Sequence, residues 1–232
     1  MRNKFAITNN VKRFLIVVDQ IMAPTVGNER MALIYGDPGL GKTETALWWV
    51  NNNNLDGVFI RTKKLMSGRW LLEEIVTELG ESPAWRTKEL FDQAVSALAG
   101  TNRIVILDEI DYLTHDARVI ETIRDIHDIT HSPFIFIGMD QADKKLKRYS
   151  HLYRRFAQVL RFEALTNEDV ISVMEQVCEI PFDDSAIQAI LSGNGMTAAM
   201  IYRWAETFER IAKSRNLQQI SALDLGVKKS RN

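Results

Sequence analysis

The residues from Gly36 to Thr43 have the types and the spacing of a phosphate-binding loop: a glycine, four residues, then Gly41, Lys42 and Thr43. Glycines let the backbone curl so that its N–H groups point inward at an anion, and a helix that begins there adds partial positive charge. Lys42 could then reach the outer phosphate oxygens of a nucleoside triphosphate, and the Thr43 hydroxyl could coordinate Mg²⁺. The residues predicted to line this site are Gly36, Asp37, Pro38, Gly39, Leu40, Gly41, Lys42, Thr43 and Glu44.

Two acids, Asp108 and Glu109, follow the continuous apolar run Ile104-Val105-Ile106-Leu107. Such a run is typical of a strand that is buried on both faces of a parallel sheet. Two carboxylates at the end of a buried strand are costly unless a cation lies beside them, and Mg²⁺ held between phosphates is the obvious candidate. We therefore expect Asp108 to bind the metal, directly or through water, and Glu109 to polarise an attacking water.

The elements that must position these residues follow an α/β pattern, because short apolar runs alternate with amphipathic helical segments. Strands are predicted at residues 31–35, 57–61, 104–107, 134–138 and 159–162. Five strands with intervening helices predict a parallel five-stranded sheet that is flanked by helices and joined by right-handed crossovers.

The strand pattern stops after Phe162, and only helical patterns follow. One helix is predicted to begin at Thr166, and another to begin near Asp183 and to end at residues 193–195. Before the first strand, periodic apolar residues predict a helix that ends at Pro24. The predicted organisation is an N-terminal helical extension (1–30), an α/β nucleotide-binding domain (31–163), a small helical lid domain (164–227) and a basic tail (228–232).

Composition is that of an ordinary globular protein, with 46% apolar and 25% charged residues and a net charge of −1. No apolar run approaches eighteen residues, so no membrane span is expected. The apolar run at residues 14–18 is short and lacks a cleavage site, so a secretory signal is not expected. The single Cys178 cannot form an internal disulfide, which favours the reducing environment of the cytoplasm.

The order of these motifs resembles that of the AAA+ ATPases: a phosphate loop, a strand ending in Asp108-Glu109, a further strand, a basic helix carrying Arg155-Phe156, and a helical lid. The resemblance covers roughly residues 10 to 225. Within that superfamily the chain is most similar to the DNA-transposition ATPases of the Mu B and TnsC types, through residues 106–113, 136–140 and 152–162. Replication initiators and helicase loaders share the same order of motifs.

The resemblance implies that ATP and Mg²⁺ bind between the subunits of a homo-oligomer, a ring or a filament, and that an arginine from the neighbour completes the site. Arg155 best matches this arginine finger acting in trans, with Arg154 as the alternative. The physical need is clear, because charge on the γ-phosphoryl oxygens must be neutralised as the bond breaks. The expected catalytic residues are therefore Lys42, Asp108, Glu109 and Arg155.

The chain departs from the family pattern at two places. At the end of the fourth strand, Gly138-Met139 stands where many relatives place a polar residue that orients the attacking water, and Asp140 or Thr114 could replace it. In the lid, a sensor arginine would be expected where the chain reads Met196-Thr197-Ala198-Ala199, with Arg203 a turn further along. Loss of both contacts predicts a slow ATPase that serves as a timer or an assembly switch.

In TnsC-like relatives, basic and hydroxyl residues after the second strand and before the following long helix hold duplex DNA. The matching residues expected to contact DNA here are Lys63, Lys64, Arg69, Thr87 and Lys88. They supply positive charge without base-reading groups, which suits sequence-independent backbone contact.

We therefore predict an ATP-dependent, sequence-non-specific DNA-binding ATPase that oligomerises on duplex DNA and regulates target selection by a transposase or another recombination protein. A helicase loader or replication-initiator-type ATPase is one alternative to this prediction. A nucleotide-gated protein-interaction module without a DNA role is another.

Overall fold

The computed structural model of the chain describes residues 4–23, 29–53, 57–192 and 196–224. Three predicted features lie outside these residues: the helix end at Pro24, the turn at 193–195 and the basic tail at 228–232.

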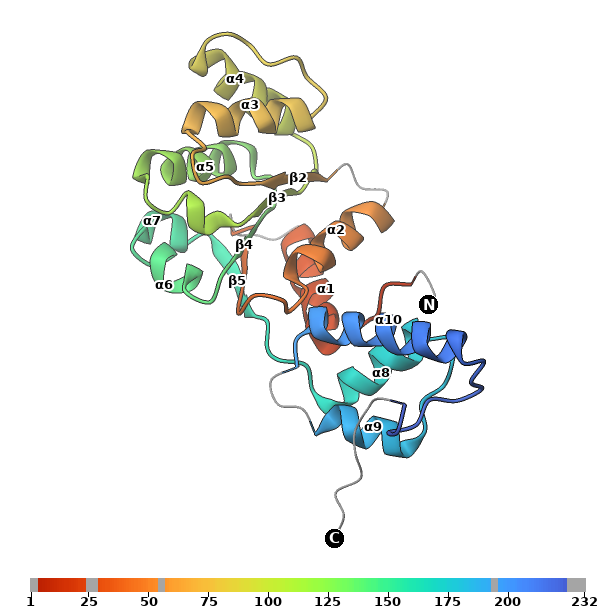
Figure 1. The fold of residues 1–232 in the computed structure, drawn as a ribbon. Coiled ribbons are helices and arrows are strands. Elements are labelled where there is room, and N and C mark those ends of the chain that lie inside the picture. The colour runs from red at the N-terminus through yellow and green to blue at the C-terminus, as the bar shows by residue number, and fades with distance from the viewer. Residues whose placement is uncertain (1–3, 24–28, 54–56, 193–195, 225–232) are drawn as a thin grey trace. The chain divides into compact units, whose positions relative to one another are not determined.

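Five parallel strands form one sheet in the order β2-β3-β4-β1-β5, as Figure 1 shows. The strands are β1 (Met31–Tyr35), β2 (Val58–Arg61), β3 (Val105–Asp108), β4 (Phe134–Gly138) and β5 (Phe156–Arg161). The predicted five-stranded parallel sheet is thus confirmed. β5 begins earlier than the predicted residue 159. The prediction missed its start because exposed residues alternate with less exposed ones along this edge strand, and no continuous apolar run marks the first residues.

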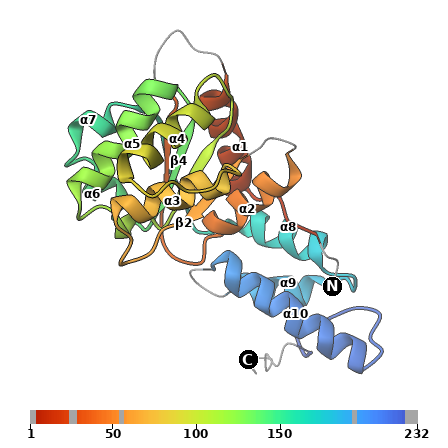
Figure 2. The same cartoon turned by 90° about the horizontal axis from the view of Figure 1, so that it is seen from above.

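Helices cover both faces of the sheet. In Figures 1 and 2, α1 (Asn9–Met22) and α2 (Lys42–Asn52) lie on one side, and α5 (Ala117–Thr130), α6 (Ala142–Leu146) and α7 (Ser150–Tyr153) lie on the other. α3 (Gly68–Glu78) and α4 (Thr87–Leu98) pack against each other and against α5. Every residue of β3 and β4 is buried as a result. Polar side chains are therefore expected at the ends of these strands and not along them.

The helices after β5 form a core of their own. They are α8 (Asn167–Val177), α9 (Asp184–Leu191) and α10 (Ala198–Ser214). The predicted start at Thr166 is a capping box, in which Thr166 Oγ1 accepts from the Asp169 N–H and the Asp169 carboxylate accepts from the Thr166 N–H. Val173 and Ile201 are fully buried in this core, and Cys178 lies beside them just after α8, 5% exposed.

The chain divides into two compact units. One contains the sheet and comprises residues 13–38 and 42–162; the other comprises residues 1–12, 39–41 and 163–232. Of the helices in the described part of the chain, none is both long enough and apolar enough to cross a membrane.

Candidate nucleotide-binding site

The carboxyl ends of the five strands meet at one edge of the sheet, because all the strands are parallel. The register places Arg61 opposite Asp108, and Tyr35 opposite both Gly138 and Arg161. In open α/β sheets, ligands bind in the crevice beyond this edge. The predicted phosphate loop and the predicted acidic pair are therefore brought to the same edge.

The predicted phosphate loop connects β1 to α2, and α2 begins at Lys42. Gly36, Gly39 and Gly41 have φ angles of 149°, 79° and 87°. Glycine adopts these positive angles without the steric cost that a side chain adds, so the curl of the loop depends on glycine at these positions. The first N–H groups of α2 have no partner within the helix, which makes its start suitable for an anion.

Lys42 is 8% exposed, and its Nζ donates to the carbonyl oxygens of Gly36 and Asp37, each at 2.8 Å. The ammonium thus lies inside the curl of the loop, where phosphate oxygens could replace the two carbonyls as acceptors. Burial lowers the pKa of Lys42, and four carboxylates oppose this shift: Asp108, Asp37, Asp111 and Asp140.

Thr43 Oγ1 donates to Asp108 Oδ2 at 2.9 Å, so the loop hydroxyl and the strand-end carboxylate face each other, as two ligands of one small cation must. Asp108 is 1% exposed. Burial raises the pKa of Asp108, while hydrogen bonds from the Thr43 hydroxyl and the Glu109 N–H lower it. A carboxylate that is costly to bury in this way is stabilised by a cation beside it.

These residues fit Mg²⁺ together with a nucleotide. Within the described ranges, no three or more His, Cys, Asp or Glu side chains gather into a group that could hold a metal ion. Mg²⁺ needs about six oxygen ligands and is commonly bound through one or two carboxylates plus substrate phosphates. Thr43 and Asp108 would supply the protein ligands, and phosphate oxygens and water the others.

Glu109 has a left-handed backbone conformation, with φ 57° and ψ 39°. Its N–H donates to Asp108 Oδ1 at 2.9 Å, and its carbonyl accepts from Thr62 Oγ1 at 2.6 Å. A non-glycine residue in this conformation costs about 1–3 kcal/mol, and such residues cluster at functional sites. The Glu109 side chain is 38% exposed, so it can meet a water molecule at the sheet edge.

Arg61, the last residue of β2, faces both acids. Its Nε lies 3.2 Å from Glu109 Oε1 and 3.6 Å from Asp108 Oδ2. Arg61 ends the second predicted strand, residues 57–61, and was not predicted to belong to the site. The contact depends on β2 being the neighbour of β3, and no local motif reveals that neighbour.

Thr114 and Asp140 were expected to orient the attacking water in place of a polar residue at position 138, but the side chains of both already have partners. The Thr114 hydroxyl donates to the Asp111 carbonyl at 2.8 Å. Asp140 forms an ion pair with Arg161 at 2.7 Å. Asp111 lies at this position instead, and its Oδ2 accepts from the Met139 N–H at 2.7 Å.

Arg155 lies between α7 and β5, and the prediction that it belongs to a basic helix is wrong because α7 ends at Tyr153. Its guanidinium makes a two-point ion pair with Asp128, with Nε–Oδ1 and Nη2–Oδ2 distances of 2.6 and 2.8 Å. Arg154 is exposed. Arg155 would therefore have to leave Asp128 to act in a neighbouring subunit, whereas Arg154 already faces solvent.

The residues predicted to contact DNA lie in the loop before α3 and at the starts of α3 and α4. Arg69 Nη1 donates to the carbonyl of Trp85 at 2.5 Å, which brings the start of α3 to the loop before α4. Lys64 and Thr87 are exposed. The other three form ion pairs: Lys63 with Glu74 (2.9 Å), Arg69 with Glu73 (2.8 Å) and Lys88 with Asp92 (2.6 Å).

Known proteins resemble this chain both in sequence and in fold. The ATP-dependent target DNA activator B of Escherichia phage Mu is 28% identical over 154 residues, which are 63% of this chain and 49% of that protein. The chain therefore spans about half the length of the phage protein. The replication factor C large subunit of Staphylothermus marinus is 24% identical over 168 residues, 70% of this chain and 36% of that subunit.

Among solved structures, the ORC2 protein of Aeropyrum pernix, in ADPNP–ADP complexes, has the same fold, with a TM-score of 0.74. The sequences are 13% identical, and the match covers 97% of this chain and 68% of ORC2. Residues 26–146, which include the phosphate loop and the Asp108-Glu109 pair, match the AAA domain family. The chain belongs to the AAA domain family, and its parallel sheet with flanking helices is the fold of an AAA+ ATPase.

Proposed function

We propose that this chain is an ATP-dependent, sequence-non-specific DNA-binding ATPase that assembles on duplex DNA and regulates target selection by a transposase or another recombination protein. The observation that supports its nucleotide chemistry most strongly is the 2.9 Å contact between Thr43 and Asp108. It joins the phosphate loop to the acidic strand end. The DNA-targeting role is supported by the similarity to the target DNA activator of phage Mu.

In the proposed hydrolysis, Lys42 moves from the loop carbonyls to the outer phosphate oxygens, and Thr43 and Asp108 hold Mg²⁺. When bound, the metal neutralises charge on the phosphates. Glu109 polarises the attacking water. Because Arg61 now pairs with the Glu109 carboxylate at 3.2 Å, that pair must open before Glu109 can act, which supports slow turnover.

The arginine finger is proposed to act between subunits of a homo-oligomer, and Arg155 and Arg154 are its two candidates. A finger in trans predicts that Arg155→Ala subunits are inactive alone and regain turnover when mixed with Lys42→Ala subunits, which still carry the arginine. Recovery with Arg154→Ala in place of Arg155→Ala would assign the finger to Arg154. Absence of recovery with both variants would contradict an arginine acting in trans.

Of the proposed DNA contacts, Lys63, Lys64, Thr87 and Lys88 are exposed, and Arg69 is partly exposed. Exposed ion pairs such as Lys63–Glu74 contribute about 0–1 kcal/mol, so a DNA phosphate can replace the carboxylate at little cost. Contacts of this kind make affinity fall steeply with salt, and each lost contact reduces the logarithmic salt slope by about 1.

The proposal is tested by imaging the protein with random-sequence duplex DNA and ATP, where DNA-bound rings or filaments are expected. Changing Lys63 and Lys64 together to Glu should abolish these assemblies and leave nucleotide binding intact. Lys144 and Arg148, exposed on and just after α6, provide a control double change to Glu with the same change in charge. Unchanged duplex binding in the Lys63/Lys64 variant would show that the DNA contacts are misplaced.

A Glu109→Gln variant tests the hydrolytic step of the same proposal. The amide cannot take part in proton transfer from water, so the variant should remain in the assembled, ATP-bound state on DNA. Assemblies of the variant that fall apart faster than those of the wild type would contradict the role of Glu109.

A replication-type loader is the second candidate, and the similarity to the replication factor C large subunit favours it. Such a protein would act on a helicase and would not assemble on duplex DNA by itself. Nucleotide binding without DNA-bound assemblies in the imaging experiment would therefore favour a loader or a nucleotide-gated interaction module over the transposition role.

A further inference from the structure

The end of β4 cannot carry a side chain, and a neighbouring acid fills the space. A Cβ atom on Gly138 would lie 2.4 Å from Ala142 Cβ, 2.9 Å from Asp111 Oδ2 and 3.1 Å from Ile110 Cγ2. Cβ atoms essentially never approach other heavy atoms to less than 3.0 Å, so a larger residue cannot be accommodated without a shift. Ala142 and the Asp111 carboxylate therefore occupy the place that a side chain of residue 138 would take, and the carboxylate supplies a polar group there.

Asp111 in turn fixes the position of a lysine. One carboxylate oxygen accepts from the Met139 N–H at 2.7 Å, so the backbone at the end of β4 orients the carboxylate. The other oxygen accepts from Lys145 Nζ at 2.8 Å. The side chains of Asp111 and Lys145 are 11% and 37% exposed, so this pair is better shielded from water than a surface ion pair.

The strand order places the end of β4, to which Asp111 joins this lysine, between the phosphate loop and the acidic strand end. β4 lies between β1, which leads into the phosphate loop, and β3, which ends in Asp108. The charge of Asp111 acts on Lys42, which agrees with this placement. The two arginines of the same edge, Arg61 and Arg161, end the outer strands β2 and β5, and they form ion pairs with Glu109 and Asp140.

We propose that Lys145 binds the terminal phosphate of ATP and that Asp111 positions it, so that the pair supplies the polar contact that Gly138 cannot provide. This inference rests on the nucleotide site of the proposed function. An ammonium group has three N–H donors, so Lys145 can keep its bond to Asp111 and donate to a phosphate oxygen as well. Because ADP lacks the terminal phosphate, the contact distinguishes ATP from ADP.

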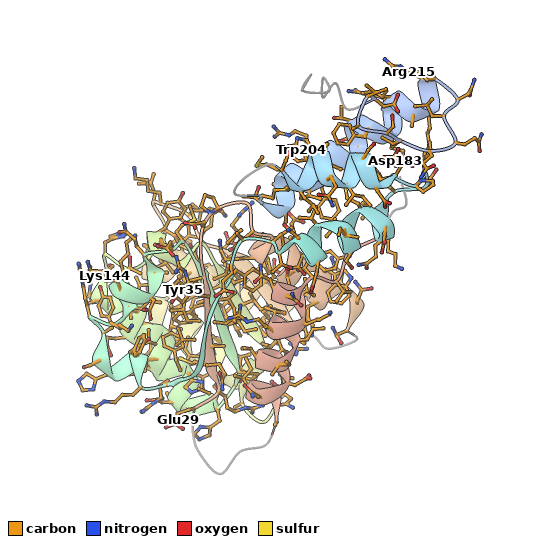
Figure 3. The ribbon with its side chains drawn as sticks, turned by 90° about the horizontal axis from the view of Figure 1, so that it is seen from below. Glu29, Tyr35, Lys144, Asp183, Trp204 and Arg215 are labelled. Carbon is orange, nitrogen blue, oxygen red and sulfur yellow. The ribbon has the colours of Figure 1, made fainter. Side chains whose placement is uncertain are left out.

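The test compares Lys145→Met with wild type by equilibrium binding of a non-hydrolysable ATP analogue and of ADP, both with Mg²⁺. Affinity for the analogue should fall about tenfold or more, as for the loss of a hydrogen bond to a charged group, while affinity for ADP stays within about twofold. Lys145→Arg should retain most of the affinity for the analogue. Lys144, on the same helix and labelled in Figure 3, is exposed, and Lys144→Met serves as the control with the same loss of charge.

An equal loss of affinity for the analogue and ADP would overturn the inference, because a merely structural ion pair would affect both nucleotides alike. Unchanged affinity for the analogue would also overturn it. Failure of the wild-type protein to bind either nucleotide would overturn the proposed nucleotide site itself, and this inference with it. Thermal unfolding of each variant identifies any loss of affinity that follows from loss of folding.

Discussion

Replacing Gly138 with alanine adds a single methyl group where the structure has no room for one. That carbon would meet Ala142 Cβ at 2.4 Å, and this atom is held by the backbone of α6, so it cannot turn away as the end of a flexible side chain could. It would also press on Asp111 Oδ2 at 2.9 Å, the oxygen that accepts from the Met139 N–H. The substitution should therefore destabilise the sheet-containing unit and disturb the Asp111–Lys145 pair.

Inserting one extra carbon into a well-packed site costs about 1–3 kcal/mol. For a chain of this size, 1 kcal/mol corresponds to roughly 2–4 °C in Tm, so Gly138→Ala should lower Tm by about 2–12 °C. Gly68→Ala is a matched control, because its Cβ would meet Val119 Cγ2 at an ordinary 3.5 Å, at the start of α3. We expect that control to be neutral or slightly stabilising, since alanine favours helix more than glycine does.

Thermal or urea unfolding followed by tryptophan fluorescence measures both effects. Adding Ala142→Gly to Gly138→Ala removes the closest clash, so the double variant should lose less stability than the sum of the single changes. A Gly138→Ala protein as stable as the Gly68→Ala control would refute the argument that Asp111 and Ala142 fill the space at the end of β4.

Two further predictions concern carboxylates whose pKa values are shifted in the folded protein. Burial raises the pKa of Asp108, so its negative charge destabilises the nucleotide-free fold at neutral pH. Asp108→Asn should therefore raise the free energy of unfolding by about 1 kcal/mol and abolish Mg²⁺-dependent nucleotide binding. A nucleotide-free variant that is less stable than the wild type would contradict this. The hydrogen bond from Arg155 lowers the pKa of Asp128, so the pair stabilises the fold above the ordinary aspartate pKa of about 3.9 and loses this effect as the pH falls through the lowered value. The free energy of unfolding in urea should therefore be about 1 kcal/mol higher for wild type than for Asp128→Asn at pH 7, and the difference should be smaller near pH 3. An equal difference at both pH values would argue against the ion pair as its cause.

The sequence allowed the fold to be predicted well where local patterns carry the information. Buried runs such as residues 104–107 and 134–138 stand out as strands, because a parallel sheet that is covered on both faces needs continuous apolar residues. The edge strand β5 was predicted too short, and the helix before it too long, because the polar Gln158 interrupts the apolar residues at the start of this strand.

The same distinction applies to the site. Lys42, Thr43, Asp108 and Glu109 were predicted because each belongs to a contiguous motif with a known chemical need. Their placement at one sheet edge agrees with that prediction. Other residues at this edge, Arg61, Asp111 and Lys145, join it only through strand order and the packing of α6 against the end of β4, which no local pattern records.

The most direct measurement is equilibrium binding of Mg²⁺–ATP to the wild-type protein and to Lys42→Met. The buried ammonium in the phosphate loop predicts that the wild type binds and that the variant, still folded, binds at least about tenfold more weakly. A wild-type protein without affinity for ATP, or a Lys42→Met protein that binds as tightly as the wild type, would contradict a triphosphate site in this loop.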